Sequence, residues 1–492
     1  MNSLGIILLF ANLLFAPMLV MLIKGVRGIV LAFAIPWLVL SPRAGVNLPG
    51  LPMFTKDQAV SLGVLFGVLL FRGDIVRRIR LKPVDVFVLA WLCSASISSL
   101  TNGLGPWDAM SEFYGRAVIW GVPYFIGRAM IRTLEDVRQC AIGVIIAGLI
   151  AAPLCLIEIR LSPQLHKWVY GIHAAPFHMS LRLGAYRPTL MFRHGIEVGS
   201  WMACASIVAL WFAVIAGRQR FLSAPAMLHA ALVLGVTVLC RSLGSLVLLF
   251  GSSCVALFTR ATRLRIALVL LVLATPCYIG VRITGMWSPD LIADTVERYV
   301  DADRAASMRA RTYQEEELGA KAARRRAFGW GGHNRFRVFD DQGDATTAVD
   351  ALWLIAYGKN GVFGLIGLYG MVCFPALMIL RRTPARLLIH QRMAGVVGLL
   401  LAVMIATGDS LQNAFFSPLM TLSAGVLATT AVSLGTWLPR RSAAPAAAPR
   451  PDATNNPELS HAVDAGQRPP GIFLPDHQSH RQPPETAPRS TP

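Results

Sequence analysis

The sequence predicts an all-α polytopic membrane protein with about 12–13 transmembrane helices. Hydrophobic residues make up 54% of the chain and charged residues only 15%. Apolar runs of about 15–22 residues recur from Leu4 to Leu438, and a helix that crosses a bilayer needs about 20 such residues. One long polar segment, residues 283–349, interrupts this pattern. The prediction is therefore a membrane bundle that carries one large helical loop.

Thirteen apolar segments are the predicted spans. In chain order they are residues 4–22, 28–42, 58–71, 84–100, 113–127, 138–158, 194–217, 225–240, 242–258, 264–282, 350–380, 393–408 and 415–438. The first has the length of a signal peptide, but Lys24 and Arg27 follow the apolar run instead of preceding it. No small-residue cleavage site is evident, so this segment is predicted to be a retained helix.

Alternate short connections between the spans are basic, and short basic connections are typical of the cytoplasmic side. They are the segments 72–82, 128–138, 218–220, 260–265 and 381–392. Lys24 and Arg27 fall on the same side, which places the N-terminus outside. Much of the net charge of +19 is explained in this way and does not indicate nucleic-acid binding.

The chain is predicted to divide into four parts. Residues 1–282 form an N-terminal transmembrane bundle with an outer loop at 160–193, and residues 283–349 form the large outer loop. Residues 350–438 form the C-terminal transmembrane helices. Residues 439–492, rich in Pro, Ala, Ser, Gln and His, have too few apolar residues to offset the entropy of ordering. They are predicted to be a disordered cytoplasmic tail.

Two outer segments are basic, against the orientation bias. Residues 160–193 hold five Lys or Arg and no acidic residue, and residues 304–337 hold nine Lys or Arg and three acidic residues. The third outer segment, residues 101–112, is short and nearly uncharged. Long loops cross the membrane despite positive charge. An anionic ligand held at the outer leaflet is a physical reason for keeping these basic side chains there.

Arg241 interrupts an apolar stretch, residues 226–258, that is too long for one span and barely long enough for two. It is therefore predicted at the tip of a tight outer hairpin. A charge at this depth is costly and usually faces an interior cavity or a partner. The alternative is an arginine that extends to the lipid headgroups.

The segment 304–323 has the composition of a helix, with Arg311 and Glu315 on one face. Arg311 is expected to point into a cavity, oriented by Glu315, because a guanidinium binds phosphate oxygens bidentately and keeps its proton. The alternative is a solvated face on which this ion pair contributes little. The run Arg324–Arg326 is expected to be solvated or to face headgroups.

The Gly-rich turn Gly329–Asn334 carries one imidazole, His333. Its glycines are expected to allow a close approach of the backbone to a ligand. His333 is a candidate general base or hydrogen-bond donor to phosphate, and Asn334 a candidate substrate contact. The alternative for His333 is an exposed loop histidine.

Four further candidate substrate contacts lie where the 160–193 loop returns to the membrane. Arg187 and Arg193 are expected to hold lipid phosphate or an acidic glycan. Glu197 lies one helical turn beyond His194 and needs a partner at that depth, which His194 or an arginine is expected to supply.

Three candidates remain, Asp350, Asp409 and Asn413. Asp350 is a candidate substrate contact whose simpler role is to cap the following helix. Asp409 and Asn413 occupy the last outer connection, where they cap a helix or contact substrate. The sequence contains no metal-binding motif in an outer segment, so no metal and no cofactor is predicted.

Taken together and in this order, several motifs resemble the bacterial O-antigen polymerase and O-antigen ligase superfamily. The resemblance covers most of residues 84–430. The motifs are Trp120-Gly-Val-Pro-Tyr-Phe-Ile-Gly-Arg128, Tyr186-Arg-Pro188, Phe192-Arg-His-Gly195, Arg241-Ser-Leu-Gly244, Gly329-Trp-Gly-Gly-His-Asn334, Asp350-Ala-Leu-Trp353 and Gly358-Lys-Asn-Gly361.

The resemblance implies a GT-C-like glycosyltransferase of the bacterial inner membrane with its active site facing the periplasm. Its donor would be an undecaprenyl-diphosphate-linked glycan and its other partners an acceptor glycan, membrane lipid and other polysaccharide-assembly proteins. Arg241 and Arg311 match family arginines and would neutralise the leaving diphosphate in place of a metal. His333 matches the family histidine. Transfer would be inverting.

The expected activity is polymerisation of lipid-linked repeat units into an exopolysaccharide or O-antigen. Ligation to lipid A core is the close alternative, because it uses the same chemistry. A transporter or flippase for lipid-linked sugar is a rival of another class, but it predicts two similar halves with broken helices at mid-membrane. A non-enzymatic scaffold of an envelope complex is a third reading.

Overall fold

The structure is a computed structural model that describes most of the chain. The described residues are 3–49, 52–182, 184–216, 220–221, 224–286, 294–295, 297–298, 302–346 and 349–437. They belong to one compact unit of the chain, Met1–Leu438. The predicted disordered tail, residues 439–492, lies outside the described residues.

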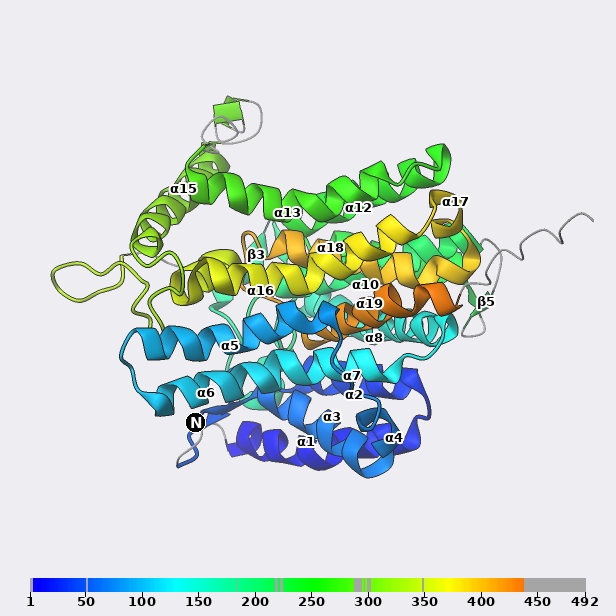
Figure 1. The fold of residues 1–492 in the computed structure, drawn as a ribbon, viewed down its shortest axis with the longest axis horizontal. Helices are drawn as coiled ribbons and strands as arrows, with labels where there is room; N and C mark the ends of the chain where they lie inside the picture. The colour runs from blue at the N-terminus through cyan, green and yellow to red at the C-terminus, as the bar shows by residue number, and fades with distance from the viewer. Residues whose placement is uncertain are drawn as a thin grey trace, which may run out of the picture. The chain divides into compact units, whose positions relative to one another are not determined.

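Helices make up almost all of this unit, and most of them run side by side along one direction (Figure 1). The first half of the chain forms α1 (Ser3–Leu22), α2 (Val26–Val39), α3 (Lys56–Phe71), α4 (Gly73–Val76), η1 (Pro83–Asp85), α5 (Val86–Thr101), α6 (Pro106–Arg116), η2 (Ala117–Gly121), α7 (Val122–Met130), α8 (Leu134–Leu161), α9 (Leu165–Tyr170), η3 (Phe177–Ser180) and α10 (Gly195–Ala216). The second half forms α11 (Ala226–Leu239), α12 (Leu243–Thr262), α13 (Ile266–Thr284), α15 (Ala302–Ala323), α16 (Leu352–Arg382), α17 (Ala385–Leu388), η4 (Gln391–Met393), α18 (Ala394–Asp409) and α19 (Pro418–Trp437).

Strands occur only as three short antiparallel hairpins in the described ranges. They pair β1 (Gly45–Val46) with β2 (Phe54–Thr55), β3 (Leu181–Arg182) with β4 (Ala185–Tyr186), and β5 (Arg220–Phe221) with β6 (Ala224–Pro225). Each is a two-residue ribbon in a connection between helices. The bundle is therefore all-α, as the sequence predicts.

Nine helices in the described part of the chain are long and apolar enough to cross a membrane. They are α1, α5 with η1, α8, α10, α12, α13, α16, α18 with η4, and α19. α2 and α11 are apolar but shorter. The other two predicted spans coincide with α3 and with the α6–η2–α7 run. A multi-pass, all-α membrane protein is thus confirmed.

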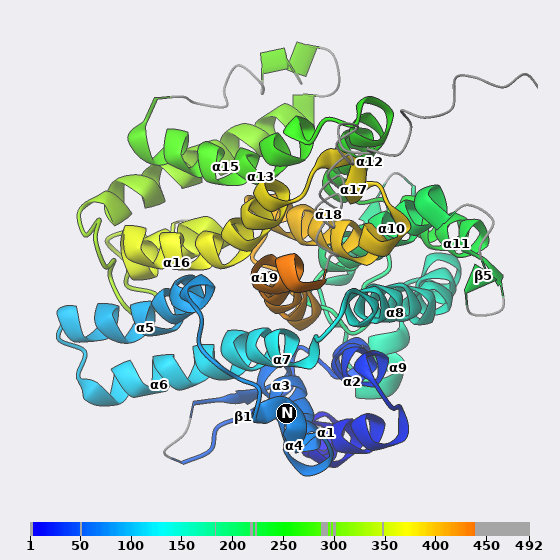
Figure 2. The same cartoon turned by 45° about the vertical axis from the view of Figure 1, so that its right-hand side comes forward.

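Helices at the centre of the bundle have a larger buried fraction than helices at its rim. In α18, 83% of the residues of the apolar window are buried, whereas in α13 only 22% are. α10, α18 and α19 therefore form the centre, and Figure 2 shows α19 surrounded by other helices. α12 and α13 lie at the rim and expose apolar side chains, as helices that face lipid do.

The predicted outer and inner connections gather at opposite ends of the helices. In Figure 1 the connection between α15 and α16 lies at one end, with the α5–α6 turn, while α4 and α17 lie at the other. At the first end, the side chain of Asn102 donates a hydrogen bond to the carbonyl of Gly329 (2.9 Å). At the second, Arg265 donates to the carbonyl of Leu380 (2.9 Å). The basic short connections therefore share one end of the bundle.

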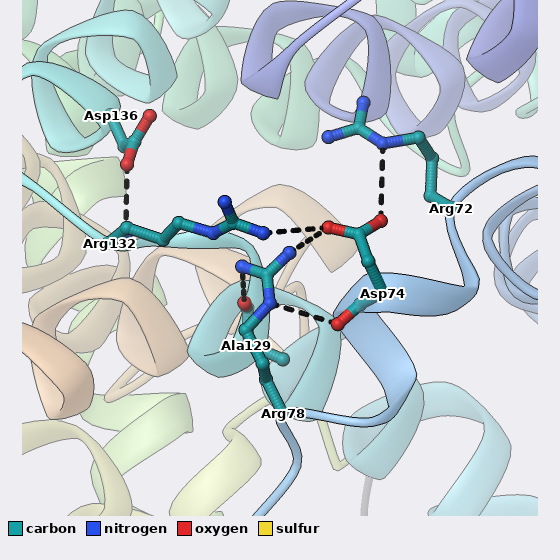
Figure 3. A network of polar contacts seen from close by, with 6 residues as sticks. All are labelled: Arg72, Asp74, Arg78, Ala129, Arg132 and Asp136. Atoms are coloured by element: carbon teal, nitrogen blue, oxygen red, sulfur yellow. Dashed lines mark hydrogen bonds and ion pairs between the residues drawn. The ribbon is translucent and has the colours of Figure 1, made fainter.

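An aspartate organises part of that basic end (Figure 3). The carboxylate of Asp74, in α4, accepts hydrogen bonds from the guanidinium groups of Arg78 and of Arg132 (2.8 Å), and Arg72 lies 3.7 Å away. Arg78 also donates to the carbonyl of Ala129, at the end of α7 (3.2 Å). These contacts fix α4 against the α7–α8 connection, and three arginines around one carboxylate leave net positive charge at this end.

The segment before α7 differs from the prediction. Residues 101–112 were expected to be an outer loop and 113–127 a span, but α6 already begins at Pro106 and continues through the π-helical turn η2 into α7. Gly105, with φ 94°, ends the turn, and proline at the first helical position needs no hydrogen-bond partner for its nitrogen. Asp108 and Glu112 consequently lie on a helix.

The Gly-rich turn docks by its backbone against a break in α16. The helix is interrupted at Gly361, which has φ 64° and ψ −163°. There the amides of Trp330 and Val362 donate to the carbonyls of Gly358 (2.8 Å) and Arg326 (2.8 Å). A β-carbon on Gly361 would collide with the backbone of Ala327. Gly329 and Gly361 thus allow backbone to approach backbone, and the approach of the turn to a ligand stays a prediction.

Gly361→Ala is expected to destabilise the protein by at least ~2 kcal/mol, because alanine disfavours a positive φ and its methyl group has no space. The measurement is the Tm of the purified protein in detergent. Gly319→Ala is the matched control, since that helical position in α15 has open space and alanine favours a helix. Equal Tm values for Gly361→Ala and wild type would contradict this role of the break.

Candidate functional site

Arg241 lies in the tight turn between α11 and α12, as predicted. Its backbone is left-handed, with φ 53°, which lets the chain reverse within three residues. Its Nη1 donates to the carbonyl of Arg182 (3.1 Å), and its own carbonyl accepts from Nη2 of Arg187 (3.0 Å). The membrane hairpin and the 160–193 loop therefore meet, and they bring three arginines together.

The β3–β4 hairpin presents Arg182 and positions Arg187 directly after it. Arg187 is only 7% exposed, and its side chain packs against the Cα of Gly195, where a β-carbon would collide. Its Nε and Nη1 have no hydrogen-bond partner among the described residues. Burial, and then the charge of Arg182, lower the pKa of Arg187. A buried guanidinium with free donors is costly unless an anion satisfies it.

His194 borders the same cluster. Burial, followed by the charges of Arg187 and Arg182, lowers its pKa, so the imidazole is neutral at neutral pH. Its Nδ1 accepts a hydrogen bond from the amide of Ile196 (3.1 Å), which places the proton on Nε2. His194 therefore offers a neutral donor beside the arginines. Of the two predicted partners of Glu197, the structure favours an arginine, because Arg193 and not His194 interacts with this carboxylate.

Arg193 and Glu197 form a different group, with two residues of α3. The guanidinium of Arg193 pairs with Asp57 (2.5 Å), and its amide donates to the carboxylate of Glu197 (3.0 Å). Lys56 is buried and donates to the carbonyl of Met191 (2.6 Å). These charges largely neutralise one another. The group fixes α3 against the start of α10. Because the carboxylate of Asp57 already pairs with the guanidinium of Arg193, this side chain is less able to bind a phosphate.

The predicted pairing of Arg311 with Glu315 is not formed. Glu315 instead accepts from Nε of Arg282 (3.2 Å) and from the hydroxyl of Tyr278 (3.3 Å), both in α13. Burial raises the pKa of Glu315, and Arg282 opposes this shift. Glu315 therefore anchors α15 to α13, and its candidate role as a substrate contact stays a prediction. Arg311 donates to the side-chain oxygen of Gln412 (3.2 Å).

Neighbours of Arg311 and of Arg241 contact the N-terminal part of α10. Asp409, at the end of α18, is close enough to Ser200 and to Arg311 to interact electrostatically with both. The preceding residue of α10, Gly199, packs so closely against Ser242 that a β-carbon would collide. The N-terminal part of α10 thus connects the hairpin of Arg241 to the side chain of Arg311.

The geometry around α16 and α18 bears on the capping roles predicted for Asp350 and for Asp409 and Asn413. Asp350 does not cap α16, because the helix begins at Leu352 with Ala351 at its N-cap position. Asp350 is instead near enough to His194 to influence it electrostatically. Asn413 donates to the carboxylate of Asp409 (2.9 Å), which holds the α18–α19 connection.

His333 lies at the opening of a separate cavity of about 410 Å³. Its side chain is 67% exposed, and its Nε2 lies 3.3 Å from the carboxylate of Asp108 in α6. In the neutral imidazole Nε2 would donate to Asp108, leaving the lone pair of Nδ1 free to accept a proton. His333 is therefore an exposed loop histidine, which was the alternative to a functional role. The carboxylate of Asp108 also orients its imidazole. Asn334 adjoins it, outside the lining of this cavity.

The backbone fixes where this imidazole lies. His333 and Asn334 are both left-handed, with φ 57° and 56°, a conformation that costs energy outside glycine. The backbone bonds to α16 hold the turn, and Arg325 adds a hydrogen bond to Asn102 and lies 4.7 Å from the centre of the Trp330 ring. Arg325 is therefore a tether and not merely a solvated charge.

Asp108 and Glu112 are the residues that the sequence reasoning missed. They lie four residues apart on α6, on the face that lines the cavity with His333. Their signal was two carboxylates, one helical turn apart, in an outer segment of a strongly basic chain. Interpreting residues 101–112 as a nearly uncharged loop hid that spacing.

The predicted catalytic residues are thus divided between two places. Arg241 lies in the α11–α12 turn and Arg311 contacts Gln412 in the α18–α19 connection, and neither is in the lining of the His333 cavity. No group of three or more metal-ligating side chains occurs among the described residues.

In comparisons with known proteins, no protein-family model matches this sequence and no curated protein matches it.

Proposed function

We propose that this protein is a glycosyltransferase that joins lipid-diphosphate-linked repeat units into an exopolysaccharide or O-antigen. The observation that carries the proposal is the buried Arg187, whose Nε and Nη1 have no partner among the described residues, beside Arg241 and Arg182. Such a cluster at the end of a membrane bundle suits a diphosphate at the lipid surface.

In the proposed reaction an acceptor sugar hydroxyl attacks the anomeric carbon of the donor. The new glycosidic bond forms as the bond to the lipid diphosphate breaks, with inversion at that carbon. His333 takes the hydroxyl proton at Nδ1. The bonding pair leaves with the diphosphate, and Arg241 and Arg311 stabilise the charge that develops on it.

The proposed function also requires a particular membrane topology. If α2, α3, α6–α7 and α11 also cross the membrane, the chain has thirteen passes, and the Arg241 turn, α15 and the Gly-rich turn face the same side. We infer that this side is the periplasm of an inner membrane, because the basic connections at the other end favour the cytoplasm. The resulting arrangement, with one large helical outer loop, is GT-C-like.

Lipid-linked intermediates distinguish this reaction from transport. Cells that lack the protein are expected to accumulate single repeat units on lipid at the outer face of the inner membrane. The measurement is extraction and mass analysis of lipid-linked oligosaccharides, with accessibility to an added impermeant glycosidase in spheroplasts. Single units confined to the inner face would indicate a flippase and contradict the proposal. Complete polymer left on lipid, without transfer to lipid A core, would indicate the ligase reaction.

A further inference from the structure

The cavity beside His333 has the charge and lining of a site for an uncharged polyhydroxylated ligand. One face of α6 supplies Asp108, Ser111, Glu112, Gly115 and Arg116, and the Gly-rich turn supplies His333. Its volume of about 410 Å³ lies within the range of small-molecule sites, which is about 300–1,000 Å³. The lining combines a few convergent polar groups with apolar surface.

Glu112 is the acceptor that most needs a ligand. Its Oε1 reaches the turn, since a β-carbon on Gly332 would lie 3.1 Å from that atom. No hydrogen bond from a described residue reaches its carboxylate, which interacts electrostatically with Arg116 and Lys359. A carboxylate with free lone pairs on a cavity wall accepts hydrogen bonds from hydroxyl groups.

The guanidinium of Arg116, which lines the cavity, already donates hydrogen bonds to other parts of the protein. The guanidinium of Arg116 donates to the hydroxyl of Ser94 (2.8 Å), the carbonyl of Trp91 (3.0 Å) and the side-chain oxygen of Asn360 (2.5 Å). Two carboxylates and one engaged guanidinium disfavour a diphosphate here. The anionic part of a substrate therefore belongs at the arginine cluster and not in this cavity.

An aromatic ring completes the lining. Trp120 borders the cavity and is held between Trp91, at 5.6 Å and a near-perpendicular angle, and Phe416, stacked at 5.3 Å. A fixed indole offers an apolar surface to the C–H faces of a sugar ring while its neighbours keep its orientation.

We infer that this cavity is a neutral-saccharide subsite, distinct from the arginine cluster, in which Glu112 accepts hydroxyl hydrogen bonds. The inference rests on the proposed function in one respect: the saccharide is the acceptor, whose attacking hydroxyl then lies beside His333. For transfer, a donor held by its diphosphate at the arginine cluster and an acceptor in this cavity must meet at one anomeric carbon.

The test uses the full chain in lipid nanodiscs with two probes. The first is a panel of unphosphorylated neutral di- to tetrasaccharides, including the repeat unit released from the cells' own surface polysaccharide. The second is inorganic pyrophosphate. Binding is measured by saturation-transfer NMR for the sugars and by calorimetry for pyrophosphate.

At least one neutral oligosaccharide is expected to bind. Glu112→Gln should weaken that binding about tenfold, because it removes the charge from a hydrogen-bond acceptor. Ser111→Trp should abolish it by filling the cavity. Both variants should keep the pyrophosphate affinity of the wild type, whereas Arg187→Gln should lose pyrophosphate binding and keep the sugar. The isosteric Glu112→Gln keeps the test decisive if Ser111→Trp lowers the Tm.

Absence of binding by every oligosaccharide, or equal sugar affinity in wild type, Glu112→Gln and Ser111→Trp, would overturn the subsite. The proposed function fails separately. If Arg241→Ala and Arg311→Ala cells still make polymer while Glu112→Gln loses sugar binding, the saccharide site stands and the transferase does not.

Discussion

Arg241→Ala and Arg311→Ala are each expected to abolish long-chain polysaccharide while the protein remains in the membrane. Negative charge develops on the diphosphate as the glycosidic bond breaks, and a fixed cation at that point lowers the barrier. Removal of one such group lowers the rate by about 10²–10³-fold. The measurement is the length distribution of the polysaccharide on a gel, with quantification of the protein in membranes.

Arg309→Ala is the matched control, since this residue lies on α15, close in sequence to Arg311. Arg309 is exposed and forms ion pairs with Asp294 and Glu297 on its own side of the segment. Surface ion pairs contribute little, so normal chain length is expected. Normal chain length in both Arg241→Ala and Arg311→Ala cells would disprove the proposed mechanism.

His333→Ala is expected to reduce transfer by about 10²–10⁴-fold, the usual contribution of a general base. Asp108→Asn is expected to have a smaller effect, about tenfold, because the amide retains shape but loses a charged acceptor for Nε2. Asp108 is a positioning residue, so the loss should appear in kcat with KM nearly unchanged. The measurement is the steady-state rate of transfer with purified protein.

His178→Ala is the matched control for this histidine, because His178 is exposed in η3 of the other outer loop. It should transfer at the wild-type rate. Wild-type kcat in His333→Ala would exclude His333 as the base and leave it as a surface residue of the turn.

The sequence was sufficient for the features that depend on apolar length. An apolar stretch too long for one span, broken by one charge, led directly to the turn at Arg241, and the structure confirms that turn. The spans of the long helices follow from the same count. Nothing beyond bilayer thickness and helix rise is needed for either prediction.

Contacts between distant segments were not predictable in the same way. Glu315 falls on the helical face of Arg311, but Arg282, at the end of another helix, is its partner. The glycines of the turn signalled a close approach, yet only the fold shows that Gly329 lies against the backbone of Lys359 and Asn360. Local spacing identifies which residues are unusual, whereas tertiary packing decides what they contact.

The resemblance also assigned Arg241, Arg311 and His333 to one active site, whereas neither arginine is in the lining of the His333 cavity. The interpretation of residues 101–112 as a loop removed Asp108 and Glu112 from consideration, although helix α6 presents both to His333. A proline at the start of a helix and two carboxylates four residues apart were the available signals.

The most direct measurement is transfer by the purified protein in nanodiscs, with a lipid-diphosphate-linked single repeat unit as the only substrate and EDTA present. The account predicts that wild-type protein releases one lipid diphosphate for each glycosidic bond formed, and that Arg241→Ala releases almost none. Glycan growth that does not release lipid diphosphate, or movement of the donor across the bilayer without bond formation, would contradict the account.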